Sequence, residues 1–295
     1  MGAKTEFPGT ALVTGASSGF GRLTALALAR QGWTVYAGVR NPDAAAPFWE
    51  ERGQDPSDPA SSRIRMVKLD VTDEEEIIET IETIEREAGG LDALVNNAGY
   101  AAGGFVEELP LSAWRAQFET NVFGAVAVTR QALPLLRRSG RGRIVLVGSI
   151  SGRIGFPGLA PYCASKHALE GLGESLRLEL AEFGISVSLV EPGAYRTPIW
   201  GKGIEALSPP SADSPYARLY SRLQPMMRKS AAGGGDPERV AETVVRAITD
   251  KRPKMRYLPG RGEKTLLWSK AMLPWSWVER AALKAIGVRS RRNGS

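Results

Sequence analysis

Two pairs of reactive side chains are interleaved in the segment 161–172, PYCASKHALEGL. Cys163 and His167 lie four positions apart, and so do Tyr162 and Lys166, so on a helix each pair would share one face. Cys163 is the only cysteine and His167 the only histidine of the 295 residues. One ligand of each kind cannot complete a zinc site within a single chain. We therefore predict no metal site, and a packing role for this face within the domain or against a neighbouring subunit.

Tyr162 and Lys166 offer acid–base chemistry instead. A tyrosine hydroxyl titrates near pH 10, so it rarely serves as a base near neutrality without help. A lysine charge one helical turn away favours the phenolate. The alternative is a surface pair at i and i+4, which stabilises the helix and catalyses nothing.

A glycine-rich turn, TGASSGFG at 14–21, stands between an expected strand and an expected helix. Gly15, Gly19 and Gly21 follow the pattern G-x-x-x-G-x-G. Glycines there let the backbone turn tightly and approach a pyrophosphate, which would lie at the N-terminus of the helix. Ser17 and Ser18 add hydroxyl donors. The turn predicts a dinucleotide site, against the alternative of a plain glycine-rich connection.

The second expected strand ends at Val39-Arg40, without an acidic residue. A carboxylate at that position would suit the free 2′-hydroxyl of NAD(H), whereas an arginine suits the 2′-phosphate of NADP(H). Arg40 therefore favours NADP(H) over NAD(H). The alternative is an ordinary solvated arginine.

Short apolar runs alternate with amphipathic segments along the chain, which has 43% hydrophobic and 24% charged residues. Strands are expected at 10–15, 33–40, 64–70, 91–99, 142–149, 184–193 and 254–259, and helices at 20–32, 72–90, 111–140, 160–182 and 236–250. This alternation predicts an α/β protein, a single-domain doubly wound parallel sheet of the Rossmann type with helices on both faces. We expect a cofactor-binding domain over 1–260 and a C-terminal helical extension over 261–295.

Further motifs follow in order: NNAG at 96–99, Asn121, Ser149 thirteen residues before Tyr162, and EPGAYRT at 191–197. Together with the glycine-rich turn and the Tyr162/Lys166 pair, they resemble the short-chain dehydrogenase/reductase family from about residue 9 to 198. The resemblance implies hydride transfer between a nicotinamide cofactor and an alcohol or carbonyl. Gly148 departs from the family, which often has a serine there, but no catalytic position is missing.

The resemblance implies a role for each matching position. Tyr162 would be the general acid/base, and Lys166 would lower its pKa and hold the nicotinamide ribose. Ser149 would donate to the reacting carbonyl, and Asn121 would keep a proton-relay water near Lys166. Counting the turn and Arg40, the expected cofactor-binding residues are Gly15, Ser17, Ser18, Gly19, Phe20, Gly21, Arg40, Asp70, Val71, Asn97, Ala98, Gly99, Tyr162, Lys166, Pro192, Gly193 and Thr197.

The branch that the segments 121–137, 153–180 and 190–197 most resemble contains 17β-hydroxysteroid and retinol dehydrogenases, which implies a bulky apolar substrate. The alternatives are a 3-oxoacyl-thioester reductase and a non-catalytic NADP-sensing regulator. The segment 194–235 is rich in Pro, Gly and Ser and is expected to form a substrate lid. Its Ile199, Trp200, Met226 and Met227 would line an apolar pocket or merely pack the lid down.

The net charge of +6 is unevenly distributed, because residues 251–295 hold 12 Lys/Arg and only 2 Glu. Trp268, Trp275 and Trp277 share this basic tail, which can pack on its own domain, contact a partner subunit or lie on an anionic membrane surface. With no secretory signal, no run of 18 apolar residues and one cysteine, a cytoplasmic location is expected. Nucleic-acid binding has only charge in its favour. The resemblance implies a homodimer or homotetramer built through the helices near 112–138 and 160–182.

Overall fold

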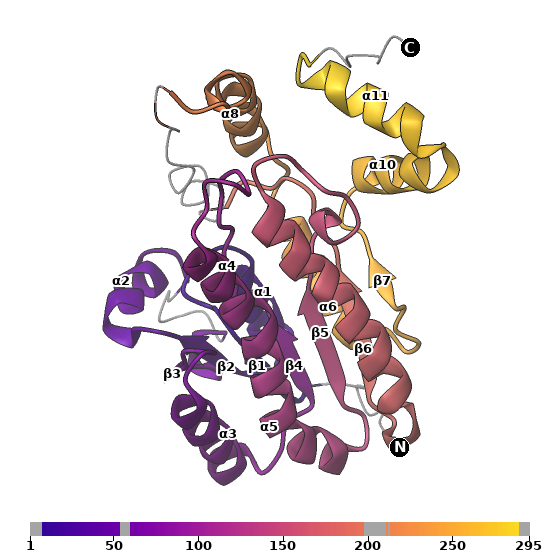
Figure 1. Cartoon of the computed structure of the whole chain (residues 1–295). Coiled ribbons are helices and arrows are strands. Elements are labelled where there is room, and N and C mark those ends of the chain that lie inside the picture. Colours follow the sequence, from indigo (N-terminus) through magenta and orange to yellow (C-terminus); the bar gives the residue numbers. More distant parts are fainter. Residues whose placement is uncertain (1–7, 54–59, 198–210, 212, 289–295) are drawn as a thin grey trace.

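The structure is a computed structural model that describes residues 8–53, 60–197, 211 and 213–288. Its centre is a seven-stranded sheet in the order β3-β2-β1-β4-β5-β6-β7, in which every pair of neighbours is parallel (Figure 1). The strands are β1 (Thr10–Val13), β2 (Thr34–Val39), β3 (Ile64–Lys68), β4 (Ala93–Asn96), β5 (Arg143–Val147), β6 (Ser186–Val190) and β7 (Arg256–Tyr257). Chain order reverses between β1 and β4, so a ligand crevice is expected at the carboxyl ends of these strands.

Helices cover both faces of the sheet. Those expected at 20–32, 72–90, 160–182 and 236–250 are present with bounds that agree to within a few residues, whereas the helices over 42–53 and 217–232 were not among the expected ones. They are α1 (Gly19–Arg30), α2 (Pro42–Gly53), α3 (Glu74–Ala88), α4 (Leu111–Phe118), α5 (Gly124–Ser139), α6 (Ala160–Glu179), α8 (Ala217–Ala232), α9 (Glu238–Thr249), α10 (Arg261–Met272) and α11 (Trp275–Ala285). The predicted fold, a single-domain doubly wound parallel sheet, is confirmed.

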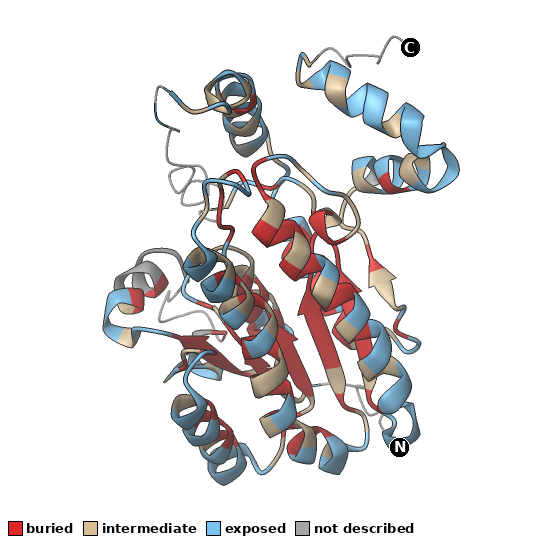
Figure 2. Ribbon diagram, viewed as in Figure 1, coloured by how far each residue is buried: buried red, intermediate tan, exposed pale blue. Residues whose placement is uncertain are grey.

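Two apolar cores lie on opposite faces of the sheet (Figure 2). Along β1, Ala11 and Val13 join the core beneath α1 and α9, while Leu12 between them joins the core beneath α3 and α5. The same alternation recurs in β4. Because both faces of a parallel sheet are covered, its strands are apolar at nearly every position, which is why they read as continuous apolar runs in the sequence.

The long helix expected over 111–140 is interrupted. A π-helical turn over Glu119–Phe123 separates α4 from α5, and Pro134 lies inside α5. Such turns insert a residue into the helical ladder and often mark functional sites. This one carries Asn121, whose side chain is thereby turned inward and buried.

The C-terminal helices pack much less closely. Leu267 is the buried residue of α10, and α11 has none (Figure 2). Among the described residues, each helix is too short or too polar to cross a bilayer.

Candidate active site and cofactor cleft

A cavity of about 660 Å³ opens at the carboxyl ends of the strands. It gathers nearly all the residues that the sequence singled out, from the connections that follow the six strands β1 to β6. Its lining includes Gly15, Ser17, Ser18, Gly19, Phe20, Arg40, Asp70, Val71, Asn97, Ala98, Gly99, Ser149, Tyr162, Lys166, Pro192, Gly193 and Thr197. Gly21 and Asn121 are the expected site residues that do not line it.

The glycine-rich turn leaves no space for a side chain at Gly15 and Gly21. Gly15 has φ +64°, and a Cβ there would lie 2.7 Å from the Cα of Ala98. Gly21 lies within α1, where a Cβ would come within 2.4 Å of the Asn97 side chain. Ser18 occupies the N-cap position of α1 but its side chain makes no capping hydrogen bond. The first-turn amides of α1 and this hydroxyl are therefore available to a phosphate group.

A threonine that the sequence analysis missed connects this turn to NNAG. The Thr14 hydroxyl is buried and accepts hydrogen bonds from the backbone N–H groups of Asn97 (3.0 Å) and Ala98 (2.9 Å). In return, Nδ2 of Asn97 donates to the carbonyls of Thr14 and Gly15. Its position at the end of the first apolar run is the signal that could have found it.

Tyr162 and Lys166 both point into the cavity from the first two turns of α6, and both are buried. The Lys166 Nζ lies 5.7 Å from the centre of the Tyr162 ring and donates to the Val147 carbonyl at 2.8 Å. Burial raises the pKa of Tyr162 to about 12, an effect that Ser149 opposes by hydrogen bonding. Burial lowers the pKa of Lys166 to about 8. The protein alone therefore favours a protonated tyrosine.

Ser149 follows β5 and caps the short helical turn Ile150–Gly152. Its hydroxyl accepts from the backbone N–H of Ser151 (3.1 Å) and lies 3.3 Å from the carbonyl oxygen of Pro192. These contacts join the end of β5 to the segment after β6. They hold the hydroxyl at the cavity wall, beside Tyr162.

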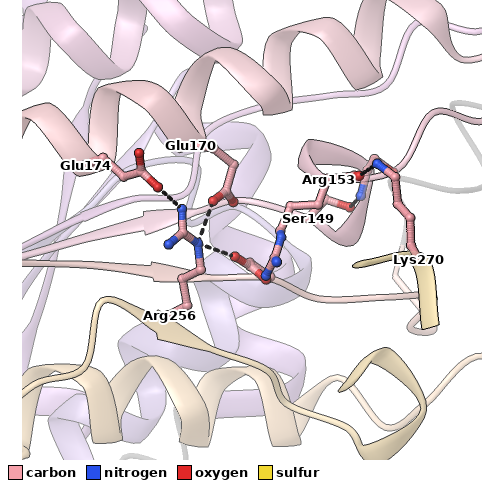
Figure 3. Close-up of polar contacts among 8 residues, drawn as sticks. Ser149, Arg153, Glu170, Glu174, Arg256 and Lys270 are labelled. Atoms are coloured by element: carbon pink, nitrogen blue, oxygen red, sulfur yellow. Dashed lines mark hydrogen bonds and ion pairs between the residues drawn. The ribbon is translucent and has the colours of Figure 1, made fainter. Parts of the chain in front are cut away.

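Behind Ser149 lies a cluster of charged side chains that sequence reasoning did not anticipate (Figure 3). Arg256 from β7 lies 2.9 Å from Glu170 and 3.1 Å from Glu191, and it also pairs with Glu174. Arg153 reaches Glu191 from the other side at 3.5 Å. Glu191 has no exposed surface, and burial together with the nearby Glu170 raises its pKa. Since Glu191 directly precedes Pro192, this cluster fixes the base of the segment facing Ser149.

Asn121 does not point into the cavity. Its amide exchanges two hydrogen bonds with the backbone of Tyr100, both 3.1 Å, and donates a third to Ser165 at 3.1 Å. These contacts fix the strand-end segment 99–100 against α6. The relay role implied for Asn121 stays a prediction.

The two ends of the cavity differ in character. At one end, Arg40 is exposed and Asp70 accepts hydrogen bonds from the N–H and hydroxyl of Thr72. At the other end, the buried hydroxyl of Thr197 has no hydrogen-bond partner among the residues that the structure describes. An unpartnered buried hydroxyl is costly unless a ligand satisfies it. With the glycine turn at the centre, these features suit an elongated dinucleotide.

Other expectations concerned the lid and the second residue pair. Met226 and Met227 lie on α8 and do not line the cavity, while Ile199 and Trp200 fall outside the described residues. Cys163 is buried, and its carbonyl lies 2.8 Å from Nδ1 of the exposed His167. Among the described residues, no three side chains of the metal-binding types lie close enough to hold a metal ion.

Comparison with known proteins places this geometry in a family. Residues 9–207 match the model of the short chain dehydrogenase family. The chain belongs to that family. It is 44% identical over 268 residues to an uncharacterised oxidoreductase, YusZ, of Bacillus subtilis, covering 90% of this chain and 94% of the relative. It is 36% identical to mouse retinol dehydrogenase 5, covering 93% of this chain and 86% of the relative.

Solved structures agree. A short-chain dehydrogenase from Streptomyces avermitilis superposes with a TM-score of 0.77 at 34% identity, covering 96% of this chain and 98% of the other. ElxO with bound NADP gives a TM-score of 0.71 at 27% identity, covering 88% of this chain and all of the other. The protein is thus a short-chain dehydrogenase/reductase, an oxidoreductase that acts on CH–OH groups. Members of this family use NAD(P) and act on small substrates.

Proposed function

We propose that this short-chain dehydrogenase uses NADP(H) to interconvert an apolar alcohol and its ketone or aldehyde, with Tyr162 as the acid/base. The observation that carries the proposal is the convergence of Tyr162, Lys166 and Ser149 on the cavity that also receives the glycine-rich turn. The intact set, with Asn121 beside it, argues against a regulator that binds NADP without turnover.

The cofactor, when bound, supplies or accepts the hydride. Tyr162 gives its proton to the substrate oxygen in reduction and takes it back in oxidation. Its raised pKa keeps the hydroxyl protonated, so in reduction it is ready to donate. Lys166 contributes positive charge that lowers the cost of the phenolate, and Ser149 donates a hydrogen bond to the reacting oxygen. Pro192, Gly193 and Thr197 would hold the nicotinamide end of the bound cofactor.

The preference for NADP(H) rests on Arg40 at the end of β2, where no carboxylate competes for the ribose. ElxO, the relative with NADP bound, supports the same choice. We expect Arg40→Asp to raise the KM for NADPH at least tenfold and to leave that for NADH unchanged or lower, because the new carboxylate repels a 2′-phosphate. NADH serves as the internal control, and an unchanged NADPH/NADH ratio would contradict the role of Arg40.

The relatives and the expected lid segment support one substrate class. Retinol dehydrogenase 5 acts, by its name, on a bulky apolar alcohol, and the helix α8 of the present chain belongs to the segment expected to cover the substrate. We propose a steroid-, retinoid- or aryl-like substrate. A 3-oxoacyl-thioester reductase is the alternative, and a panel of these carbonyls assayed with NADPH separates the two.

The decisive variant is Tyr162→Phe, which removes the hydroxyl and keeps the ring. NADPH-dependent reduction should fall at least a thousandfold while NADPH binding, followed by its fluorescence, stays within threefold. Tyr36→Phe is a matched control, since that hydroxyl bonds Glu87 of α3 and does not line the cavity. Turnover retained by Tyr162→Phe would overturn the assignment.

We further propose that the protein is cytoplasmic, with a domain over 1–260 and an extension over 261–295. The extension contacts an anionic membrane surface. Six apolar side chains of α10, α11 and their connection are exposed: Leu266, Trp268, Met272, Leu273, Trp275 and Trp277. No acidic residue lies between Glu263 and Glu279, whereas Lys264 and Lys270 do. Tryptophan beside lysine suits a lipid interface.

A homodimer or homotetramer through α4, α5 and α6 is our proposal for the assembly of the protein.

Co-sedimentation with vesicles containing phosphatidylserine tests this contact. The double variant Trp275→Ala/Trp277→Ala should lose most of the binding. The double variant Leu178→Ala/Phe183→Ala is the matched control, because it removes two exposed apolar side chains near the end of α6. Equal sedimentation of both variants and the unaltered protein would refute the membrane contact.

A further inference from the structure

Helix α10 of the C-terminal extension touches the segment that follows β6. The first turn of α10 carries Glu263, whose Oε1 accepts a hydrogen bond from the Tyr195 hydroxyl at 2.9 Å and another from the Gly193 backbone N–H at 3.3 Å. Gly193 lines the cofactor cavity. A residue about 70 positions along the chain, outside the family match, therefore bonds directly to the wall of the site.

Two glycines make room for this carboxylate. A Cβ on Gly193 would lie 2.9 Å from Oε1 of Glu263, and a Cβ on Gly260 would lie 2.1 Å from Oε2. The Glu263 carboxylate thus fills the space between Gly193 and Gly260, and a side chain at either position would collide with it. Such close approach fixes where α10 begins relative to Gly193.

Tyr195 extends the contact to the phosphate-binding turn. Its ring is buried and meets that of Phe20 edge to face, with centroids 6.0 Å apart. On its other side the ring packs against Gly235, where a Cβ would come within 2.7 Å. Burial and the neighbouring Glu263 raise the pKa of Tyr195, so its hydroxyl stays protonated and donates. Glu263 therefore anchors the Tyr195 ring, which lies between Phe20 of the glycine-rich turn and Gly235 at the end of the segment 194–235.

A second residue of α10 reaches the neighbouring segment. Lys270 donates to the backbone carbonyl of Arg153, just beyond the turn that Ser149 caps (Figure 3). Since Ser149 and Pro192 are themselves in contact, α10 touches both halves of the wall that carries the reacting hydroxyl and the nicotinamide end.

We propose that Glu263 is a positioning residue of the active site, which holds Gly193 and Tyr195 so that the segment 192–197 presents the nicotinamide ring at the correct depth. This role rests on the proposed function, because the segment is the one assigned to the nicotinamide end. A charged acceptor shared by two donors is stronger than a neutral one, which suits a contact that must hold a loop. The first turn of α10, with which the extension begins, therefore belongs to the catalytic domain.

Hydrogen exchange of the protein without cofactor tests the contact itself. In Glu263→Ala, the amides of 193–197 should exchange at least tenfold faster, because an acceptor of Gly193 is lost. Glu263→Gln keeps an oxygen acceptor and should exchange within threefold of the unaltered protein. Glu279→Ala, on the exposed face of α11, removes the same charge and should leave this segment unchanged.

Cofactor affinity and kinetics test the positioning role. In Glu263→Ala, we expect kcat to fall about tenfold to a hundredfold and the Kd for NADPH to rise, since small displacements of reacting groups cost orders of magnitude in rate. The Kd for ADP-ribose, which lacks the nicotinamide, should stay within twofold. Glu263→Gln should recover most of kcat. A Glu263→Ala protein that matches Glu279→Ala in exchange, affinity and kcat would overturn the proposal.

The two proposals fail in different ways. If the unaltered protein reduces none of the carbonyls, that result counts against the proposed function alone. Amide hydrogen exchange and the Kd for NADPH still decide the role of Glu263. Equal weakening of NADPH and ADP-ribose would show a general loss of structure and would also refute a local positioning role.

Discussion

Replacing Lys166 by methionine should make the protein more stable while it abolishes activity. Burial lowers the pKa of this lysine from its ordinary value of 10.5 to about 8, so at pH 7 the folded protein carries a charge that its surroundings disfavour. A difference of one in pKa is worth about 1.4 kcal/mol, so carrying this charge costs the folded state about 3 kcal/mol. Methionine has a similar length and no charge. It also leaves the Val147 carbonyl without its donor, which costs about 1 kcal/mol.

The net expectation for Lys166→Met at pH 7 is a gain of about 2 kcal/mol in the free energy of unfolding, or roughly 3 °C in Tm. The sign depends on pH. The unfolded chain binds the lysine proton more tightly than the folded one, so the penalty is complete below about pH 8 and fades as the pH rises toward 10.5. At pH 9.5 the advantage of the variant should therefore be close to zero.

Urea denaturation of the protein without cofactor, followed by tryptophan fluorescence at both pH values, measures this difference. Lys284→Met, which removes an exposed lysine of α11, is the control and should show no such dependence on pH. Lower stability of Lys166→Met at pH 7, or a gain that is equal at both pH values, would refute the assignment of a buried, charge-strained lysine.

Two further outcomes follow from the same cavity wall. Gly15→Ala should abolish detectable NADPH binding and lower stability by at least 1 kcal/mol, because φ is +64° there and the new methyl would collide with Ala98; calorimetric titration and a thermal melt check it. Glu191→Gln should match the unaltered protein in stability near pH 4 and exceed it at pH 8. The raised pKa favours the protonated form in the folded state, so ionisation above neutrality is destabilising and glutamine avoids it; melts across this range that run parallel would contradict the shift.

The order of strands and helices followed from the sequence because each buried strand is apolar on both sides. The cavity lining followed too, since glycine spacing and residues at strand ends are local signals. The break at Glu119–Phe123 did not, because a π turn depends on how Asn121 is satisfied by Tyr100, a contact between residues 21 positions apart. Thr14 is close to the motif and could have been found.

Glu263 and the charged cluster around Glu191 lay beyond sequence reasoning for a different reason. Glu263 bonds to residues 68 and 70 positions away, and the ion pairs of the cluster join residues 38 to 86 positions apart. Nothing in the local pattern marks a glutamate that bonds to a distant backbone amide. A glutamate in the first turn of a helix is ordinarily explained by its favourable interaction with the dipole of that helix. Only the packing of α10 against the segment after β6 distinguishes it.

The concealment of Cys163 makes the protein convenient for site-specific labelling. The one thiol of the chain is buried beside Tyr162, and burial raises its pKa, so little thiolate is available to a maleimide. A cysteine introduced at the surface, such as Ser276→Cys between the two exposed tryptophans of α11, would be the reactive one. A fluorophore or spin label placed there would report directly on the environment of the C-terminal helices.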